Sequence, residues 1–130
     1  MIVLDASAVV ELVLKTDLGS KVAERVRAPQ ESLHAPHLLD VEVAQVLRRF
    51  VLRGLVEEER AAEALLDLRD LDVTRYPHDV LLPRMWQLRE NFSAYDAAYL
   101  ALAESLDALL LTTDQRLSRA GGHGANVAVL

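Results

Sequence analysis

The chain has 130 residues, and its 20 acidic and 14 basic side chains give a formal net charge of -6, which argues against a broad basic face for nucleic acid. This length suits one domain with a real core, and no apolar run approaches the roughly 20 residues of a membrane helix. The absence of cysteine excludes disulfides and thiolate metal sites, and Asp5 and Glu11 interrupt the place of a signal-peptide core, so we expect a single-domain cytoplasmic protein.

The first predicted element is a strand over Ile2–Leu4, which runs directly into Asp5, Ala6 and Ser7. A short apolar run without polar alternation is typical of a strand buried on both faces of a parallel sheet. Asp5 would then lie at the carboxyl end of the strand, where ligands bind in open parallel sheets. Capping is the alternative reading, because Asp5 or Ser7 could accept backbone N–H bonds from the next helix.

Helical and strand patterns alternate along the rest of the chain, as they do in α/β proteins. Pro29, Pro36 and Pro77 interrupt these patterns, and Gly54 is the expected stop of the strongest helix. The expected elements are helices over 6–15 and 20–28, a strand over 33–35, helices over 38–53 and 57–71, a weak strand over 72–76, helices over 79–90 and from 92 onward, and strands over 109–111 and 126–129.

The helix over 38–53 carries two acids, Asp40 and Glu42. At about 100° per residue, Glu42 lies at the edge of the apolar arc and Asp40 lies inside it, so geometry favours neither as a site residue. Asp40 is interpreted as a first-turn carboxylate favoured by the helix dipole. On the helix over 79–90, Trp86 is interpreted as packing, in the core or on a dimer surface.

Asp96 falls on the apolar arc of the helix that follows Ser93, together with Tyr99. A carboxylate on an apolar side should be neutralised or ligated, because burying it unpaired costs several kcal/mol. The alternative reading is local, since Ser93 and Asp96 have the spacing of a capping box with Asp in place of Glu.

The apolar run Leu109–Leu111 ends in Thr112, Thr113 and Asp114, and so repeats the pattern of the first strand. Two buried strands would each deliver an Asp at a carboxyl end, and two helices carry an acid near an apolar arc. Four carboxylates could therefore converge on one crevice. The run from Gly121 to Gly124 lacks the Lys of a phosphate-binding loop and is interpreted as a turn, and the four histidines show no metal-ligand spacing.

The order of these motifs closely resembles the PIN-domain nucleases over nearly the whole chain. The motifs are Asp5 after the first strand, Pro36–Glu42, Ala94–Ala103 and Leu111–Asp114. The length and the block Tyr95–Ala101 are most similar to the VapC toxins of bacterial type II toxin-antitoxin modules.

This resemblance implies an α/β fold in which helices flank a five-stranded parallel sheet, in one PIN-like ribonuclease domain over residues 1–130. It favours Glu42 over Asp40 and implies that Ser7 and Thr112 lie beside the site. It also implies a catalytic and metal-binding acidic quartet, which consists of Asp5, Glu42, Asp96 and Asp114. Two departures from the family pattern lie outside the quartet: Asp107 stands where many relatives have Gly, and Gln45 where Asn is frequent. Asp tolerates a left-handed turn better than most residues.

Four oxygen ligands without thiolates suit Mg2+ or Mn2+, which can activate water and neutralise a phosphodiester, so an acidic protein could still cut RNA. The resemblance implies a metal-dependent endoribonuclease that acts as a toxin and inhibits translation and growth, and this metal chemistry fits that activity. Candidate RNA contacts are Arg116 and Arg119 beside the crevice, with Arg48, Arg49 and Arg53 as further arginines. The resemblance also implies a VapB-type antitoxin, which would place an Arg among the carboxylates, and a homodimer.

Two other classes of function remain open at this level. One is a catalytically silent scaffold that binds an antitoxin, which a metal-dependent cleavage assay would separate from a nuclease. The other is a haloacid-dehalogenase-like phosphatase, which needs a second Asp where Ser7 stands and a downstream Lys, whereas the only lysines are Lys15 and Lys21.

A crevice with four acids also has an electrostatic consequence. Two carboxylates about 4 Å apart repel by roughly 4 kcal/mol at an effective dielectric of 20. Without metal, at least one acid of the quartet should therefore have a raised pKa.

Overall fold

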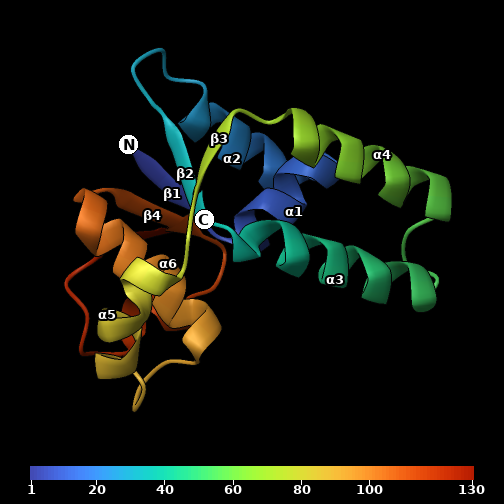
Figure 1. The fold of residues 1–130 in the computed structure, drawn as a ribbon. Helices are drawn as coiled ribbons and strands as arrows, with labels where there is room; N and C mark the ends of the chain where they lie inside the picture. The colour runs from blue at the N-terminus through green and yellow to red at the C-terminus, as the bar shows by residue number, and fades with distance from the viewer.

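The structure, a computed structural model, describes residues 1–130 (Figure 1). Its centre is a five-stranded sheet in which all neighbours are parallel, in the order β3-β2-β1-β4-β5. This confirms the expected α/β fold with a five-stranded parallel sheet. The strands are β1 (Ile2–Leu4), β2 (Leu33–Pro36), β3 (Val73–Tyr76), β4 (Leu109–Thr112) and β5 (Asn126–Val129).

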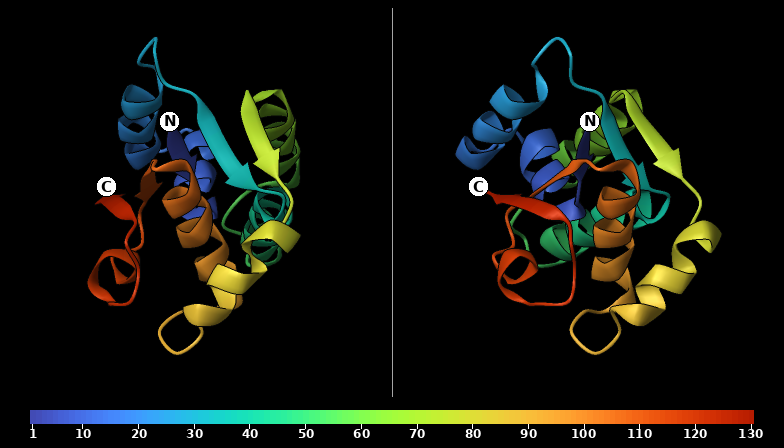
Figure 2. Two further views of the ribbon diagram at one scale, coloured as in Figure 1. Left: turned by 60° about the vertical axis from the view of Figure 1, so that its left-hand side comes forward. Right: turned by 90° about the vertical axis from the view of Figure 1, so that its left-hand side faces the viewer.

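Helices connect the strands and cover both faces of the sheet. Helix α6 contacts β1, β2 and β4 on one face, whereas α1 lies on the other face and packs against α2, α3 and α4 (Figure 2). The helices are α1 (Ala6–Leu14), α2 (Asp17–Val26), α3 (Leu38–Leu52), α4 (Glu58–Asp70), the 3-10 turn η1 (Asp79–Leu81), α5 (Leu82–Gln87), α6 (Ala94–Leu106) and α7 (Arg116–Arg119).

The central strand is as buried as its composition predicts. Val3 and Leu4 are 0% exposed, and Leu110 and Leu111 on the neighbouring β4 are also fully buried. Burying apolar side chains from both faces is the main favourable term for such a sheet, at about 25 cal/mol for each Å² removed from water. No helix of the chain combines the length and the apolar character needed to cross a bilayer.

Two helix boundaries differ from the predicted ones for local reasons. Helix α2 begins at Asp17, three residues before the predicted start at Ser20, because the Thr16 hydroxyl accepts a 3.0 Å hydrogen bond from the Gly19 N–H and caps the helix. The helix predicted over 79–90 is divided into η1 and the short α5. Pro83 stands in the first turn of α5, where its missing N–H has no cost.

Trp86 is not part of the core. It is 69% exposed on α5, and the Arg89 guanidinium lies 4.9 Å from its ring centroid. The core reading of Trp86 is therefore wrong, because the short α5 turns this side chain outward.

The carboxyl ends of α3 and α6 each have a residue in the left-handed conformation, as expected. Gly54 follows α3 with φ of 70°, which agrees with its predicted role as the stop of that helix. Asp107 ends α6 with φ of 49°, and its backbone N–H donates to the Glu104 carbonyl. The turn is thus left-handed although an Asp occupies it.

Candidate active site

The site lies where the strand order reverses, between β1 and β4. In open parallel sheets, this topological switch point opens a crevice at the carboxyl ends of the strands. Asp5 follows β1, and Thr112 is the last residue of β4, so both lie at this edge. The Thr112 hydroxyl donates a 2.5 Å hydrogen bond to Oδ2 of Asp5 and joins the two strand ends directly.

Asp5 is held on both of its oxygens. It is 6% exposed, its Oδ1 accepts from the Ser7 hydroxyl at 2.7 Å, and the same oxygen caps α1 by accepting from the Ala8 N–H at 3.1 Å. The capping role and the crevice position therefore occur together. Burial raises the pKa of Asp5, and the hydrogen bonds from Thr112 and Ser7 oppose that rise.

Ser7 and Thr112 also fix the loop that carries Asp114. The Ser7 oxygen accepts from the Thr113 N–H at 3.0 Å, and the Thr112 hydroxyl oxygen accepts from the Asp114 N–H at the same distance. Because each hydroxyl contacts Asp5 as well, the two residues tie the end of β1 to the loop after β4.

Glu42 reaches the site from α3. The hydroxyl of Tyr99, on α6, donates a 2.6 Å hydrogen bond to its Oε1. Burial raises the pKa of Glu42, the Tyr99 bond lowers it, and the charges of Asp96 and Asp5 raise it further. Asp40 points elsewhere, because Arg75 on β3 donates to both of its oxygens at 2.7 and 2.9 Å. Of the two acids on this helix, only Glu42 lies with the rest of the quartet.

Asp96 and Asp114 share one arginine. Arg116 donates to Asp114 at 2.5 Å, and the same nitrogen lies 3.9 Å from Asp96. The hydrogen bond from Arg116 holds the pKa of Asp114 below its usual range. Burial raises the pKa of Asp96, with the Asp114 charge adding to the rise and the Arg116 charge opposing it.

Only one of the two hydrogen bonds of a capping box is present between Ser93 and Asp96. The Ser93 hydroxyl accepts a 3.1 Å hydrogen bond from the Asp96 N–H and caps α6. The Asp96 carboxylate does not return a hydrogen bond to the Ser93 N–H, so it remains free to face the other acids.

The four carboxyl groups of the quartet form an electrostatic ring. Asp5 feels the charge of Asp114, Asp96 feels that of Asp114, and Glu42 feels those of Asp96 and Asp5. Three of the four have a raised pKa, as expected of at least one, but burial is the first cause in each and the repulsion between carboxylates only adds to it. No three His, Cys, Asp or Glu side chains of the chain are arranged closely enough to hold one metal ion. The ring is therefore wider than the coordination shell of one ion, and Arg116 pairs with two of its members, Asp114 and Asp96.

Two residues of the site were missed by sequence reasoning. Tyr99 was assigned only to an apolar arc. The signal that could have identified it is that a buried phenol needs a hydrogen-bond partner and that Tyr99 lies three residues after Asp96, on the same side of the helix. Tyr95 was not singled out. It is 63% exposed beside Asp96, and together with Glu42, Asp96 and Arg116 it lines a hollow of about 510 Å³, below called the acid hollow.

The chain is similar to known proteins of one family. The PIN domain family matches residues 2–123. The chain is 42% identical to Ribonuclease VapC12 of Mycobacterium tuberculosis, over 100% of this chain and 99% of that protein. It is 45% identical to Ribonuclease VapC9 of the same organism, over 93% of this chain and 91% of the relative.

Solved structures share the fold at low sequence identity. A crystal structure of a Pyrobaculum aerophilum protein aligns with a TM-score of 0.69 and 24% identity, over 89% of this chain and 76% of that one. The structure of Mycobacterium tuberculosis VapC20, described as a toxin that cleaves the sarcin-ricin loop, aligns with a TM-score of 0.69 and 13% identity, over 91% of this chain and 93% of that one. With a PIN match across the chain and VapC ribonucleases above 40% identical over nearly its full length, this chain belongs to the PIN-domain family, in the VapC group of ribonuclease toxins.

Proposed function

We propose that this protein is a divalent-metal-dependent endoribonuclease, the toxin of a toxin-antitoxin module, which hydrolyses RNA phosphodiester bonds and so inhibits translation and growth. The single observation that carries the proposal is the ring of Asp5, Glu42, Asp96 and Asp114 at the switch point of the sheet, in a chain of the VapC group. The nuclease domain comprises residues 1–130, and the protein acts in the cytoplasm.

The donor set supports Mg2+ or Mn2+ as the cofactor. Its ligands are carboxylate oxygens only, which these hard cations prefer. The raised pKa values of Asp5, Glu42 and Asp96 mean that the folded site would be stabilised by added positive charge. Mg2+ and Mn2+ bind through few carboxylates, so acids of the quartet would hold the ion although no three of them lie close enough to share it. When bound, the ion supplies an activated water and neutralises the charge that develops on the phosphate.

The neighbouring hydroxyls orient the acids for this role. Ser7 and Thr112 each donate to a different oxygen of Asp5, and Tyr99 donates to one oxygen of Glu42. Carboxylates that are fixed in this way lose little further freedom when a cation binds, which raises affinity. Ser7 and Thr112 are therefore positioning residues in this proposal.

RNA would approach through a local basic patch, because the chain as a whole is acidic. Arg116 is 77% exposed next to Asp114, and Arg119 lies one helical turn further along α7. A bound cation would compete with Arg116 for Asp114 and so release the guanidinium for phosphate. A guanidinium pairs well with phosphate oxygens, so we assign Arg116 and Arg119 to the RNA backbone.

The proposed partners are a VapB-type antitoxin and a second copy of the chain. Arg116 bonded to Asp114 illustrates how an antitoxin arginine would sit among the carboxylates in place of metal. For the homodimer, the candidate face is α5, where exposed Leu82 and Trp86 line a hollow of about 840 Å³. Sedimentation of the parent and of Trp86→Ala tests this face, since a dimer that survives unchanged in the variant excludes it.

A cleavage assay separates the nuclease from the other classes of function. Purified protein is incubated with labelled RNA in Mn2+, in Mg2+ and in EDTA, and the RNA ends are mapped. Internal cuts that require metal support the proposal. A protein that binds its antitoxin but cuts no RNA in either metal would be a silent scaffold. Release of phosphate from a phosphomonoester without RNA cleavage would indicate a phosphatase.

A further inference from the structure

Tyr95 is an exposed aromatic residue directly beside the acidic quartet. It precedes Asp96 in the first turn of α6, it is 63% exposed, and its hydroxyl has no hydrogen-bond partner within the chain. An aromatic ring at the edge of the candidate site presents a flat apolar face to solvent. Such a ring is available to stack on a planar group of a ligand.

A second hollow adjoins the acid hollow, and Tyr95 and Glu42 line both. We call it the α3 hollow. It has a volume of about 350 Å³, and its wall on α3 includes Glu42, Gln45 and Arg49. These positions follow the i, i+3, i+7 spacing of one helix face, so the hollow leads about 10 Å along the axis away from the quartet. A volume above about 300 Å³ is in the range of small-ligand sites.

Two polar side chains of the α3 hollow have no hydrogen-bond partner within the chain. Gln45 and Arg49 are exposed, and neither side chain makes a hydrogen bond or ion pair. Val41, 71% exposed, adds an apolar patch beside them. The hollow thus offers a stacking ring, an amide that can pair with a base edge, and a free cation at its far end.

We propose that the α3 hollow is a nucleotide subsite of the RNA substrate, in which Tyr95 stacks on the base next to the scissile bond and Arg49 contacts the following phosphate. The inference rests on the proposed function, because it takes RNA as the substrate. Aromatic side chains bind unstacked bases of single strands, and an arginine at the end of the groove matches the backbone charge. The Gln45 amide faces the same hollow and can read the base edge, which makes it the specificity residue of the subsite.

The charge pattern favours RNA over a protein as the occupant. The subsite begins at the quartet, where the scissile phosphate must lie. It ends at the free guanidinium of Arg49, about 10 Å further along α3. A purely apolar partner would leave Arg49 and Gln45 without partners, which costs free energy when they are covered. A strand of RNA satisfies the ring, the amide and the cation together.

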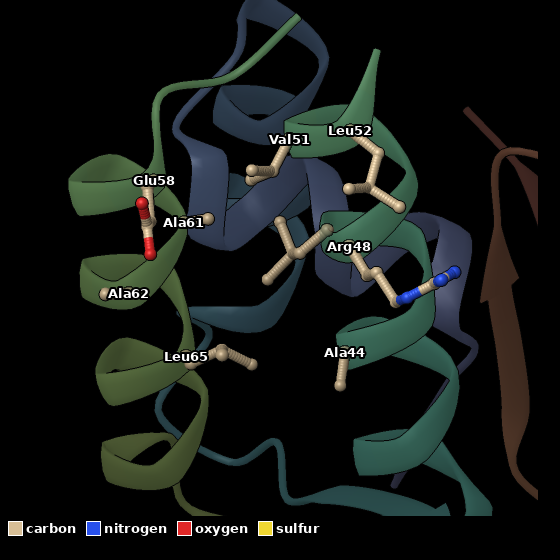
Figure 3. Close-up of a pocket in the computed structure, with 9 residues that line it drawn as sticks. Ala44, Arg48, Val51, Leu52, Glu58, Ala61, Ala62 and Leu65 are labelled. Atoms are coloured by element: carbon tan, nitrogen blue, oxygen red, sulfur yellow. The ribbon is translucent and has the colours of Figure 1, made fainter. Parts of the chain in front are cut away.

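The chain supplies a matched control in the neighbouring arginine. Arg48 has the same charge on the same helix. Although the sequence made it a candidate RNA contact, it lines a different hollow, between α3 and α4, whose volume is about 290 Å³ (Figure 3). Its wall includes Val51, Leu52 and Leu65 and none of the quartet. Removing Arg48 therefore changes the net charge as removing Arg49 does, but leaves the proposed subsite intact.

The test measures binding of a short fluorescein-labelled single-stranded RNA of mixed sequence in EDTA, where cleavage is not required. Tyr95→Ala should weaken binding about tenfold, whereas Tyr95→Phe should stay within about twofold because the ring remains. Arg49→Ala should weaken binding and reduce the salt slope by about one, and Arg48→Ala should do neither. In Mn2+, Tyr95→Ala should raise KM with little change in kcat.

Two results would overturn the subsite. Equal RNA affinity for Tyr95→Ala and the parent would remove the stacking role. A change in the sedimentation of Tyr95→Ala, with no difference between Arg49→Ala and Arg48→Ala in RNA binding, would make this face a protein interface instead. The binding assay in EDTA is independent of catalysis. A protein that binds RNA through Tyr95 but never cuts it would therefore reject the nuclease proposal and keep the subsite.

Discussion

Tyr99 donates a 2.6 Å hydrogen bond to Oε1 of Glu42, across the crevice from α6 to α3. Tyr99 is 2% exposed, and burial together with the Glu42 carboxylate drives its pKa far above the usual range, so the phenol remains a donor at every accessible pH. One lone-pair site of Glu42 Oε1 is therefore occupied by the phenol, which disfavours coordination of one cation by both oxygens. Coordination through a single carboxylate oxygen suits Mg2+ or Mn2+ better than Ca2+, a cation that readily takes carboxylates through both oxygens.

Tyr99→Phe should loosen this constraint. We expect the variant to lose about 1 kcal/mol of stability and to show a smaller rise in melting temperature with Mg2+, while the rise with Ca2+ is kept or increased. Tyr76→Phe is the matched control, because its hydroxyl bonds to His34, away from the quartet. If the two variants respond identically to both metals, Tyr99 does not set how Glu42 binds a cation.

The stability of the metal-free protein should depend on pH through Asp96. Its folded-state pKa is raised, so the folded state binds more protons than the unfolded state, and the free energy of unfolding falls as pH rises from the unfolded value of about 3.9 through the folded one. Asp96→Asn removes that loss. In EDTA near pH 7 (about three units above the unfolded value), the variant should therefore melt higher than the parent.

Asp114 should behave in the opposite way, although it belongs to the same quartet. Arg116 lowers its pKa, so its contribution to stability is present above the unfolded value and is lost as pH falls through the folded one. Asp114→Asn should consequently melt lower than the parent in EDTA near neutral pH. Differential scanning calorimetry of Asp96→Asn and Asp114→Asn measures whether their melting temperatures shift in opposite directions. Equal shifts in melting temperature would contradict the assignment of Arg116 to Asp114.

Substitutions of the two acids of α3, Asp40 and Glu42, should differ in their effect on RNA cleavage. Asp40→Asn disrupts a partly exposed pair with Arg75 and should cost less than about 1 kcal/mol, with RNA cleavage retained. Glu42→Gln should abolish cleavage with little change in stability. Rates of RNA cleavage and urea unfolding curves for both variants test this, and equal losses of activity would show that Glu42 is no more important than Asp40.

Asp107→Gly should stabilise the fold. Asp107 has φ of 49°, a conformation that strains an L residue by roughly 1 kcal/mol. Glycine adopts it without strain, although glycine loses more conformational entropy on folding, which offsets part of the gain. We expect a gain of up to about 1 kcal/mol in the free energy of unfolding, measured by urea denaturation. A loss would mean that the Asp107 side chain contributes more than its backbone conformation costs.

The sequence carried the information for the sheet and for the convergence of acids, because buried apolar runs followed by Asp5 and Asp114 mark two strand ends of a parallel sheet. Helical periodicity could not distinguish Glu42 from Asp40, because it puts both near one arc, and only the family resemblance favoured Glu42. The partner of Asp40 is Arg75, 35 residues later, and such a contact depends on tertiary packing. For the same reason, the sequence pattern assigned Tyr99 only to an apolar arc. The exposure of Trp86 depended on the division of the predicted helix over 79–90 into η1 and α5, which the pattern did not indicate.

The most direct measurement of the central claim is the rate of RNA cleavage in Mn2+ by the parent, Asp5→Asn and Asp96→Asn, with circular dichroism to verify the fold of each. Asn retains the side-chain volume and the capping ability of Asp5 but removes the charge that a cation needs. The proposed function predicts metal-dependent cleavage by the parent and none by either folded variant. Cleavage by both variants at the parental rate would contradict it and would leave the quartet as a structural feature of the crevice.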